Sequence, residues 1–578
     1  MSKKNNRPEI VPQATKKIAG KRSLLENKIF QSLCIVFFVL LIYAPTIKYE
    51  YVSLDDTSLI VDKFKFNKQA SNIPKVFAQQ VFFVPGEYNM DCVVHPKEEK
   101  KTSGYYRPVL SISFMIDAMI SNSPMPKFYR FSNIVYHIIS CLLLMSVLGL
   151  MGFSSVLSLC LTLIFATHPL FAHAIVWIPG RNDSLLTIFV LASFIYFIKT
   201  INQPGTKNYF LHFLFFLIAC LTKETAFLLP VVCFLYLLFF ERTKIFVKNN
   251  LIPVLFYLAS AVFVYSMNVH TTGGMSGLSG NVLLKMGTEY LYNIPVGLIQ
   301  FFSKVILPFN LSVLPTLEDT NFWLAAASLI ISIAAIYFSK SIKWNLVLFG
   351  ASWFIVFLLP ALFVAGKDLH EHRAYLPAIG LLISIGGILG ANLNVYDKKF
   401  YLSFSSILVI YYIVHLSNLP LYQNRFNFWG NSVTTANNAS AAYNSMSLGK
   451  LYEQTEQYDK AIEVYNSGLE RKQDQLMLNN NLGGAYMYKG MFPEAEVALK
   501  KEIALSPDNC CAYFNIGLIR KFTHHSDSSV VYWKKALEVN KDFASAYQEL
   551  AIYYRSIKDT ANYNWCAFEM QKRKLPLP

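Results

Sequence analysis

Residues 29–49 read IFQSLCIVFFVLLIYAPTIKY, an apolar run that begins directly after a basic segment. A helix needs about 20 apolar residues to cross a membrane. The run is therefore predicted to be a membrane helix, and the basic residues before it place its N-terminal side in the cytoplasm. Since no small-residue cleavage signal follows the run, we expect residues 1–28 to be a retained cytoplasmic tail.

Comparable apolar runs recur as far as residue 419. The 578 residues are 54% hydrophobic and 15% charged, which is more apolar and less charged than a soluble protein of this length. We therefore predict a polytopic membrane domain over residues 29–419 with about eleven membrane helices. The predicted spans are 29–49, 131–150, 154–170, 184–199, 208–222, 225–240, 251–269, 322–338, 344–363, 375–391 and 401–419.

One further apolar segment, residues 285–308, is not counted as a crossing. Pro295 and Pro308 interrupt it, and it contains three charged residues. We expect it to be a re-entrant or interfacial element. The basic residues of the short loops agree with this choice, because they all fall on the cytoplasmic side when the segment does not cross.

This orientation places the N-terminus in the cytoplasm and the region after residue 419 on the opposite side. That side is the periplasm of a bacterium or the lumen of the endoplasmic reticulum, and the short array of 34-residue repeats over residues 436–578 favours the bacterial inner membrane. The net charge of +16 arises from clusters at the ends of apolar runs. It therefore indicates contact with membrane lipids and argues against nucleic acid as a partner.

Residues 436–578 have a different pattern, with a period of 34 residues. Small residues recur at this spacing at Gly449, Gly483, Gly517 and Ala551, and larger residues keep it at Tyr465, Leu499 and Trp533 and at Leu469, Ile503 and Leu537. This period is typical of tetratricopeptide repeats, in which pairs of helices stack. We therefore predict an all-α chain, in which a linker over 420–435 joins the membrane helix bundle to a tetratricopeptide-repeat α-solenoid over 436–578.

Four polar clusters lie on the predicted outer side of the membrane. The first is Asp55-Asp56, just after the first span and in an outer loop expected over residues 50–130. Such a pair is suited to act as a general base or to bind a cation, and the alternative is a pair of solvated loop aspartates. The second cluster is Arg107 after two tyrosines, which could bind a lipid phosphate or anchor the loop at the membrane interface.

The third and fourth clusters lie between later spans. The third combines His168 with Arg181, Asn182 and Asp183. Charges at the mouths of helices tend to be functional, whereas a surface pair of Arg181 and Asp183 would contribute little. The fourth consists of Lys223 and Glu224 together with His370, Glu371, His372, Arg373 and Tyr375. HExxH spacing is absent from this cluster, so no metal site is predicted there.

Together the clusters predict a cavity that opens to the outer side and is lined by carboxylates and cations. Apolar helices form its walls. Such a cavity suits a lipid-linked phosphate donor and a hydroxyl acceptor. A transporter fits less well, because the middles of the predicted spans are nearly free of charge.

Five short motifs, in this order, resemble the membrane glycosyltransferases of the C-type (GT-C) fold. They are Asp-Asp at 55–56, YRPVLS at 106–111, THPLF at 167–171 with GRND at 180–183, TKET at 222–225, and EHRAYLP at 371–377. With the repeats that follow, the chain is most similar to the transmembrane and TPR repeat-containing O-mannosyltransferases and their bacterial relatives.

This resemblance implies an inverting transfer of a sugar, typically mannose, from a polyprenyl- or dolichyl-phosphate donor to a Ser or Thr hydroxyl of a protein on the outer side. It implies that Asp55 or Asp56 is the base. The residues expected to bind the donor phosphate are Arg107, Arg181, Lys223 and Arg373. Those expected to orient the sugar or partner charges are His168, Asn182, Asp183, Glu224, His370, Glu371 and Tyr375. No cofactor is expected beyond the lipid-linked donor, although some relatives of this fold use a divalent metal.

The repeats are expected to bind the protein acceptor, because stacked repeats form a concave surface suited to an extended peptide. Two alternatives remain open. The same fold could act on a lipid or a surface glycan. The chain could instead be a non-catalytic scaffold that is tethered to the membrane and organises an outer complex through its repeats.

Overall fold

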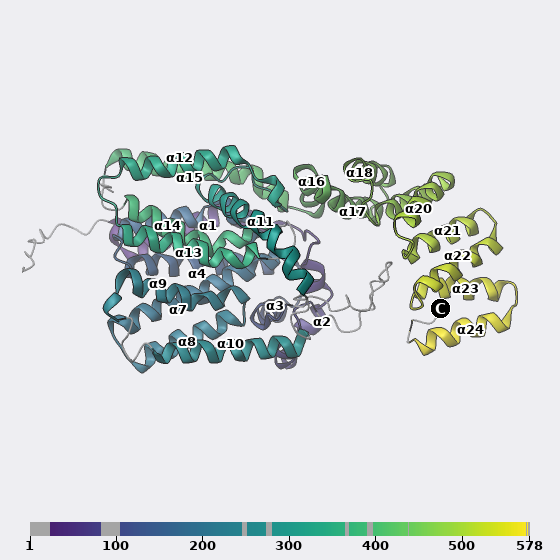
Figure 1. Cartoon of the computed structure of the whole chain (residues 1–578), viewed down its shortest axis with the longest axis horizontal. Helices are drawn as coiled ribbons and strands as arrows, with labels where there is room; N and C mark the ends of the chain where they lie inside the picture. The colour runs from purple at the N-terminus through teal and green to yellow at the C-terminus, as the bar shows by residue number, and fades with distance from the viewer. Residues whose placement is uncertain are drawn as a thin grey trace, which may run out of the picture.

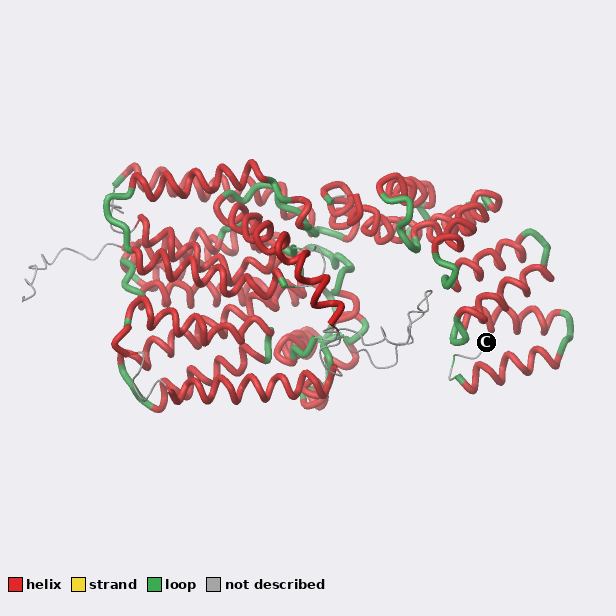
Figure 2. Tube along the Cα trace, viewed as in Figure 1, coloured by secondary structure: helices red, strands yellow, loops and turns green. Residues whose placement is uncertain are grey.

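A computed structural model describes residues 24–82, 105–244, 251–272, 280–363, 369–389, 397–436, 438–573 and 575. The regular elements of this part of the chain are helices, as Figure 2 shows. They form a bundle of long apolar helices and an arm of shorter helix pairs that projects from one end of the bundle (Figure 1). The prediction of an all-α membrane bundle followed by repeats is confirmed.

The bundle begins with α1 and ends with α15. Its helices are α1 (Lys28–Tyr43), α2 (Phe64–Asn67), α3 (Pro108–Ser121), α4 (Pro126–Leu150), α5 (Ser155–Ala166), α6 (Ala172–Val176), α7 (Arg181–Asn202), α8 (Thr206–Cys220), α9 (Leu229–Phe240), α10 (Leu251–Thr272), α11 (Gly280–Ile306), α12 (Phe322–Phe338), α13 (Trp344–Leu362), α14 (Tyr375–Leu389) and α15 (Lys398–Asn418). Each of the predicted spans overlaps one of these helices. Residues 1–23 of the predicted cytoplasmic tail lie outside the described residues.

The number of crossings is smaller when it is counted by helix length and composition. Within the described ranges, seven helices are long and apolar enough to cross a membrane, or eight if one bent pair counts as a span. The predicted spans at 208–222, 225–240 and 322–338 are apolar helices that fall short of 18 residues. The prediction of about eleven crossings therefore depends on three short helices that this criterion leaves out.

The predicted span 154–170 is the bent pair. Its first helix, α5, ends at Ala166, and the chain then turns by 50° into the segment Pro169–Val176. Pro169 explains the break, because a residue that precedes proline avoids the helical conformation. His168 accordingly has an extended backbone, with ψ at 121°.

The segment predicted to be re-entrant or interfacial forms one long helix, α11. It continues through Pro295 and lies obliquely to the neighbouring bundle helices in Figure 1. It is not among the helices that meet the length and composition criterion for a crossing. The side chains of Lys285 and Glu289 fall outside the described part of α11.

Helices α13 and α14 cross at very short range through Gly350 and Gly380. A Cβ atom on Gly350 would lie 2.2 Å from the Gly380 carbonyl oxygen, so any side chain there would push the helices apart. Small residues allow such close approach between membrane helices. The crossing fixes the position of α14 against α13, and with it the polar segment that immediately precedes α14.

The arm consists of α16 and four helix pairs. They are α16 (Arg425–Thr435), α17 (Asn438–Gln454) with α18 (Tyr458–Arg471), α19 (Leu478–Tyr488) with α20 (Phe492–Leu505), α21 (Cys510–Phe522) with α22 (Ser526–Val539), and α23 (Ala544–Ser556) with α24 (Thr560–Lys572). The residues with 34-residue spacing meet inside the pairs. A Cβ on Gly449 would lie 2.2 Å from the ring of Tyr465, and one on Gly517 would lie 2.4 Å from Trp533. Glycine is therefore needed at these points for the two helices to pack.

The predicted linker is an ordered helix, α16, that packs against the bundle. Phe428, Trp429 and Val433 on this helix are buried in the same hydrophobic core as the bundle helices. The indole of Trp429 also donates a hydrogen bond to the carbonyl of Val52 at 3.1 Å. The arm therefore starts at the end of the bundle where the loop after α1 lies, as Figure 1 shows.

Candidate functional site

Six segments that are far apart in the sequence meet around a cavity of about 370 Å³. They are the loop after α1, the start of α3, the start of α7, the turn between α8 and α9, the end of α13 and the segment before α14. Its acidic, basic and histidine lining consists of Asp55, Arg107, Asp183, Lys223, Glu224, His370, His372 and Arg373, and its apolar lining includes Leu59, Leu110, Trp177, Leu186, Phe357 and Leu376. The structure thus brings together residues from all four predicted polar clusters.

The two adjacent aspartates have different surroundings. Asp55 lines the cavity, whereas Asp56 is fully buried outside its lining and accepts a hydrogen bond from the Val52 amide at 2.9 Å. Burial raises the pKa of the Asp55 carboxyl to about 6, and the Arg107 guanidinium opposes that rise. Burial also raises the pKa of Asp56 to about 6, opposed by Arg130. Of the two, Asp55 is the one that can reach a molecule in the cavity.

Arg107 immediately precedes α3, where Pro108 begins the helix. Its guanidinium makes a two-point ion pair with Glu224, with Nη2–Oε2 at 2.9 Å and Nε–Oε1 at 3.3 Å. It also lies 4.1 Å from the centre of the Tyr105 ring. With the Asn182 amide oriented to satisfy its neighbours, its oxygen accepts from Arg107 Nη1 at 3.1 Å. These contacts join the start of α3 to α7 and to the turn after α8.

Lys223 and Asp183 form a second ion pair, with Nζ–Oδ1 at 2.7 Å. Burial lowers the pKa of Lys223, and the Asp183 carboxylate opposes that change. The other oxygen of Asp183, Oδ2, lies 3.9 Å from His372 Nε2, and among the described residues it has no hydrogen-bond partner. Arg373 lines the same cavity, and its Nη1 donates to the Ala361 carbonyl at 3.4 Å. Lys223 and Arg373 therefore supply positive charge from two further segments.

Arg181 does not line the cavity, although the sequence predicts it to bind the donor phosphate. Its guanidinium is fully buried and pairs with Asp117, with Nη1–Oδ2 at 2.6 Å. It donates to Asn133 Oδ1 and to the Tyr129 carbonyl, each at 2.8 Å, and lies 4.6 Å from the centre of the Phe114 ring. All these partners belong to α3 and α4. Arg181 thus joins the start of α7 to those two helices.

His168 and Glu371, both predicted as orienting residues, also lie outside the cavity lining and contact α11. His168 Nε2 lies 3.0 Å from the Val305 carbonyl, and its Nδ1 accepts from the Leu170 amide at 3.3 Å. Glu371 accepts a hydrogen bond from Lys304 Nζ at 2.8 Å, and both side chains are almost completely buried. The two residues therefore fix the C-terminal end of α11 against the bundle.

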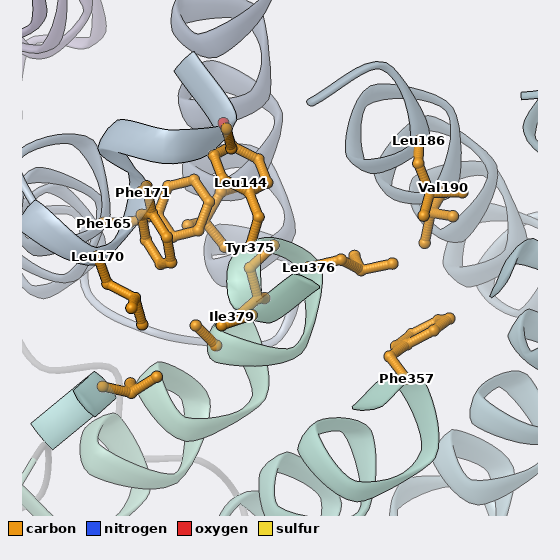
Figure 3. Close-up of a cluster of buried hydrophobic side chains, with 14 of the residues drawn as sticks. Leu144, Phe165, Leu170, Phe171, Leu186, Val190, Phe357, Tyr375, Leu376 and Ile379 are labelled. Atoms are coloured by element: carbon orange, nitrogen blue, oxygen red, sulfur yellow. The ribbon is translucent and has the colours of Figure 1, made fainter. Parts of the chain in front are cut away.

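Tyr375, the third predicted orienting residue outside the lining, is part of the hydrophobic core. Figure 3 shows its ring among the side chains of Phe165, Phe171 and Leu144. The ring centres of Phe165 and Tyr375 are 4.9 Å apart, and the Tyr375 hydroxyl lies 2.6 Å from His137 Nδ1. Its role is to pack the first turn of α14 against α4 and α5.

Two aromatic residues at the cavity, Trp177 and His173, are missing from the site predicted from sequence, and a third, His372, belongs to the fourth predicted cluster without a role. Trp177 and His372 line the cavity. His173 is completely buried next to them, with ring centres 5.0 Å from Trp177 and 4.8 Å from His372. The available signal was weak, because Trp177 resembles an interfacial anchor and His173 is a single histidine in an apolar segment.

The His-Glu-His run does not converge on one point. Glu371 points to Lys304, while the rings of His370 and His372 stack with their planes 16° apart. In the described part of the chain, no group of three or more His, Cys, Asp or Glu side chains is arranged to hold a metal ion. His370 and His372 are polar groups of the cavity lining.

The fold and the cavity define this chain as an integral membrane protein with a helical bundle, a polar cavity at one end and a tetratricopeptide-repeat arm at that same end. Residues 444–475 match the tetratricopeptide repeat family. The chain is also 19% identical over 520 residues to protein O-mannosyl-transferase TMTC3 of Mus musculus. The aligned stretch covers 78% of this chain and 55% of the relative. The human TMTC3 protein is 20% identical over 524 residues with the same coverage.

A second relative matches a shorter stretch. Human protein O-mannosyl-transferase TMTC1 is 29% identical over 150 residues, which is 24% of this chain and 17% of the relative. The predicted resemblance to the transmembrane and TPR repeat-containing O-mannosyltransferases is thus confirmed at low identity. The chain spans about half the length of the TMTC3 proteins.

Among solved structures, that of MamA is 20% identical and covers 32% of this chain and 95% of the MamA chain. The TM-score is 0.22, so this likeness carries no weight for the fold or the function of this chain.

Proposed function

We propose that this protein is a membrane glycosyltransferase that moves a sugar from a polyprenyl-phosphate donor to a Ser or Thr hydroxyl of a protein. Its relatives are named protein O-mannosyl-transferases, so the proposed sugar is mannose. One observation carries the proposal. A carboxyl group, Asp55, and three cations, Arg107, Lys223 and Arg373, come from four separate segments and line a single cavity. Such an arrangement combines a base for the acceptor with positive charge for a phosphate leaving group.

Each of these four side chains has a role in the proposed reaction. The Asp55 carboxylate takes the proton of the acceptor hydroxyl as its oxygen attacks the anomeric carbon of the sugar. The bond between that carbon and the phosphate oxygen breaks, and the lipid phosphate leaves with one additional negative charge. Arg107, Lys223 and Arg373 stabilise that charge. Attack opposite to the leaving group inverts the anomeric centre.

Asp55 is suited to this role by its surroundings. A carboxyl with a pKa of about 6 is ionised at neutral pH and is a stronger base than an exposed aspartate. Asp56 cannot serve equally well, because one of its oxygens is bound to the loop backbone and the side chain lies outside the cavity lining. We therefore assign the base to Asp55.

The arm supports a protein as the acceptor. Helices α18, α19 and α20 enclose a groove of about 1230 Å³ with acidic and amide side chains in its lining, among them Glu470, Asp474, Asn479 and Glu494. Stacked repeats bind extended peptides in grooves of this kind. Because α16 is packed on the bundle beside the loop after α1, the arm starts close to the cavity. With the N-terminus in the cytoplasm, as the basic segment before α1 indicates, both would lie on the outer side.

The catalytic assignment is tested by sugar transfer in membranes. Asp55→Asn should abolish transfer of mannose from a polyprenyl-phosphate donor to protein, because it removes the base while conserving shape. Asp62→Asn is the matched control, since Asp62 belongs to the same loop and is exposed. Full activity of Asp55→Asn would exclude Asp55 as the base, whereas the scaffold alternative predicts no sugar transfer by the wild type itself.

The role of the arm needs a separate measurement. Glu470→Lys with Glu494→Lys reverses two charges in the groove and leaves the bundle unchanged. We expect lower transfer to protein acceptors but unchanged slow hydrolysis of the donor. If the variant transfers sugar to protein at the full rate, the groove does not bind the acceptor.

A further inference from the structure

One wall of the cavity collects polar atoms that have no hydrogen-bond partner. In the described part of the chain, sixteen buried side-chain atoms lack a hydrogen-bond partner, and six of them lie in a single cluster. They are Trp177 Nε1, both ring nitrogens of His173, the Nδ1 atoms of His370 and His372, and Asp183 Oδ2. A buried polar group without a partner costs about 1–3 kcal/mol, so a concentration of six needs an explanation.

The cluster borders the cavity and is compact. Trp177, Asp183, His370 and His372 are all part of the cavity lining. The rings of His370 and His372 stack with centres 5.3 Å apart, and the ring of His173 lies 4.8 Å from that of His372. The torsion about Cβ–Cγ of a histidine is soft, so the rings of His370 and His372 in the cavity lining can turn their nitrogens at low energetic cost.

The surroundings of the histidines in this wall favour the neutral form of the imidazole. Burial holds the pKa of His370 well below its usual range, and the positive charge of Arg373 lowers it further. Three imidazoles in mutual contact beside Arg373 and Lys223 cannot all hold protons, because like charges at this range repel. A neutral imidazole carries one N–H donor and one nitrogen acceptor. The wall therefore offers donors and acceptors in equal measure, together with the carboxylate oxygen of Asp183 and the donor of Trp177.

This chemistry matches a group with several hydroxyls and does not match a phosphate. A hydroxyl donates and accepts, as the wall does, whereas a phosphate only accepts and would be repelled by Asp183. The indole of Trp177 and the stacked imidazoles also present flat apolar faces, which suit the C–H face of a sugar ring. Positive charge is supplied instead by Arg107, Lys223 and Arg373, and these side chains suit the phosphate.

We infer that Trp177, Asp183, His370 and His372, supported from behind by His173, form the subsite that binds the hydroxyls of the donor sugar. The inference rests on the proposed function, because it assigns the sugar and the phosphate of one donor molecule to different side chains of the cavity. It adds Trp177 and His173 to the site and gives His372 a role. It also predicts that these residues determine how strongly the sugar, as distinct from the lipid phosphate, is bound.

The test compares two ligands on the purified full-length protein. Farnesyl phosphate carries only the lipid phosphate, and farnesyl-phosphate mannose carries the sugar as well. The Kd of farnesyl phosphate divided by the Kd of farnesyl-phosphate mannose measures the contribution of the sugar to binding. Trp177→Phe, His370→Phe and His372→Phe each keep an aromatic ring and remove hydrogen-bonding atoms. His525→Phe, at an exposed position of the arm, is the matched control.

We expect the wild type to bind farnesyl-phosphate mannose more tightly than farnesyl phosphate. Each wall variant should reduce that ratio by about fivefold to tenfold, which is the effect of one lost hydrogen bond. The Kd for farnesyl phosphate should stay within about twofold of the wild-type value, which also shows that the variant is folded. His525→Phe should leave both Kd values unchanged.

Other outcomes overturn the inference in distinguishable ways. If the wild type shows a sugar contribution and the variants keep it, the subsite is wrong while the proposed function stands. If the variants weaken both ligands equally, the wall is structural. Stoichiometric zinc in the purified protein that His372→Phe removes would make the wall a metal site. If farnesyl phosphates bearing mannose, glucose or N-acetylglucosamine bind no better than farnesyl phosphate, both the subsite and the proposed function fail.

Discussion

Replacement of Arg181 by leucine tests whether this guanidinium holds the bundle together or binds a phosphate. The residue lies in the GRND motif beside Asn182 and Asp183, which do line the cavity. In the structure its charge is fully buried against Asp117, and it donates to the side chain of Asn133. We therefore expect Arg181→Leu to destabilise the protein and to leave the affinity for a lipid phosphate unchanged.

The magnitude follows from the burial of the pair. Arg181 is 0% exposed and Asp117 is 4% exposed, so leucine at 181 leaves the Asp117 carboxylate uncompensated in an apolar environment. Removing one partner of a buried ion pair costs about 3–5 kcal/mol, whereas replacing both partners by apolar residues is close to neutral. The double variant Arg181→Leu with Asp117→Leu should therefore recover most of the lost stability. Arg107→Leu is the contrasting variant, because its partner Glu224 is 42% exposed and such pairs contribute about 0–1 kcal/mol.

Two measurements on the detergent-purified protein separate the two roles. Thermal unfolding should show a Tm lower by several degrees for Arg181→Leu, a largely restored Tm for the double variant, and little change for Arg107→Leu. Binding of farnesyl phosphate should be weaker only for Arg107→Leu. A normal Tm for Arg181→Leu together with about tenfold weaker binding of farnesyl phosphate would refute this interpretation and would restore Arg181 as a phosphate ligand.

The structure supports three further predictions. Because the Asp55 pKa is raised to about 6 and only the carboxylate is a base, transfer should fall about tenfold per pH unit below pH 6; a rate that does not change between pH 5 and 7 would contradict this. Gly350→Val should lower the Tm, since its Cβ would meet the Gly380 carbonyl oxygen at 2.2 Å, and an unchanged Tm would show that the helices separate easily. Trp429→Phe removes the hydrogen bond to Val52 and should speed proteolytic release of the arm; equal rates would show that apolar packing alone holds it.

The sequence predicts the fold well because its signals are local. Apolar runs locate the helices, and the 34-residue period locates the repeats, since a glycine such as Gly449 recurs where Tyr465 leaves no room for a side chain. The bend after α5 was missed, although Pro169 was visible, because an apolar run of the right length hides a break in direction. The position of α11 depends on its buried contact between Lys304 and Glu371, which connects residues 67 apart and has no local signal.

The site was predicted only in part, for a geometric reason. Successive residues at the start of a helix point in directions about 100° apart, so the residues of one motif contact different parts of the structure. Asn182 and Asp183 therefore reach the cavity while Arg181 reaches α3 and α4. In the same way, His370 and His372 line the cavity and Glu371 points to Lys304. A motif in a single sequence identifies the segment, and only the packing of that segment shows which of its residues face the cavity.

The two ion pairs of the cavity differ in what they can offer a donor phosphate. Glu224 is 42% exposed, so its carboxylate can rotate towards solvent at small energetic cost. The Arg107 guanidinium can then bind a second anion. Asp183 is 4% exposed, and separating it from Lys223 would strand a carboxylate in the wall. For the proposed reaction, Arg107 is then the cation that exchanges its partner for the phosphate. Lys223 stays paired and acts on the phosphate only through its field, while Asp183 remains in place for the sugar.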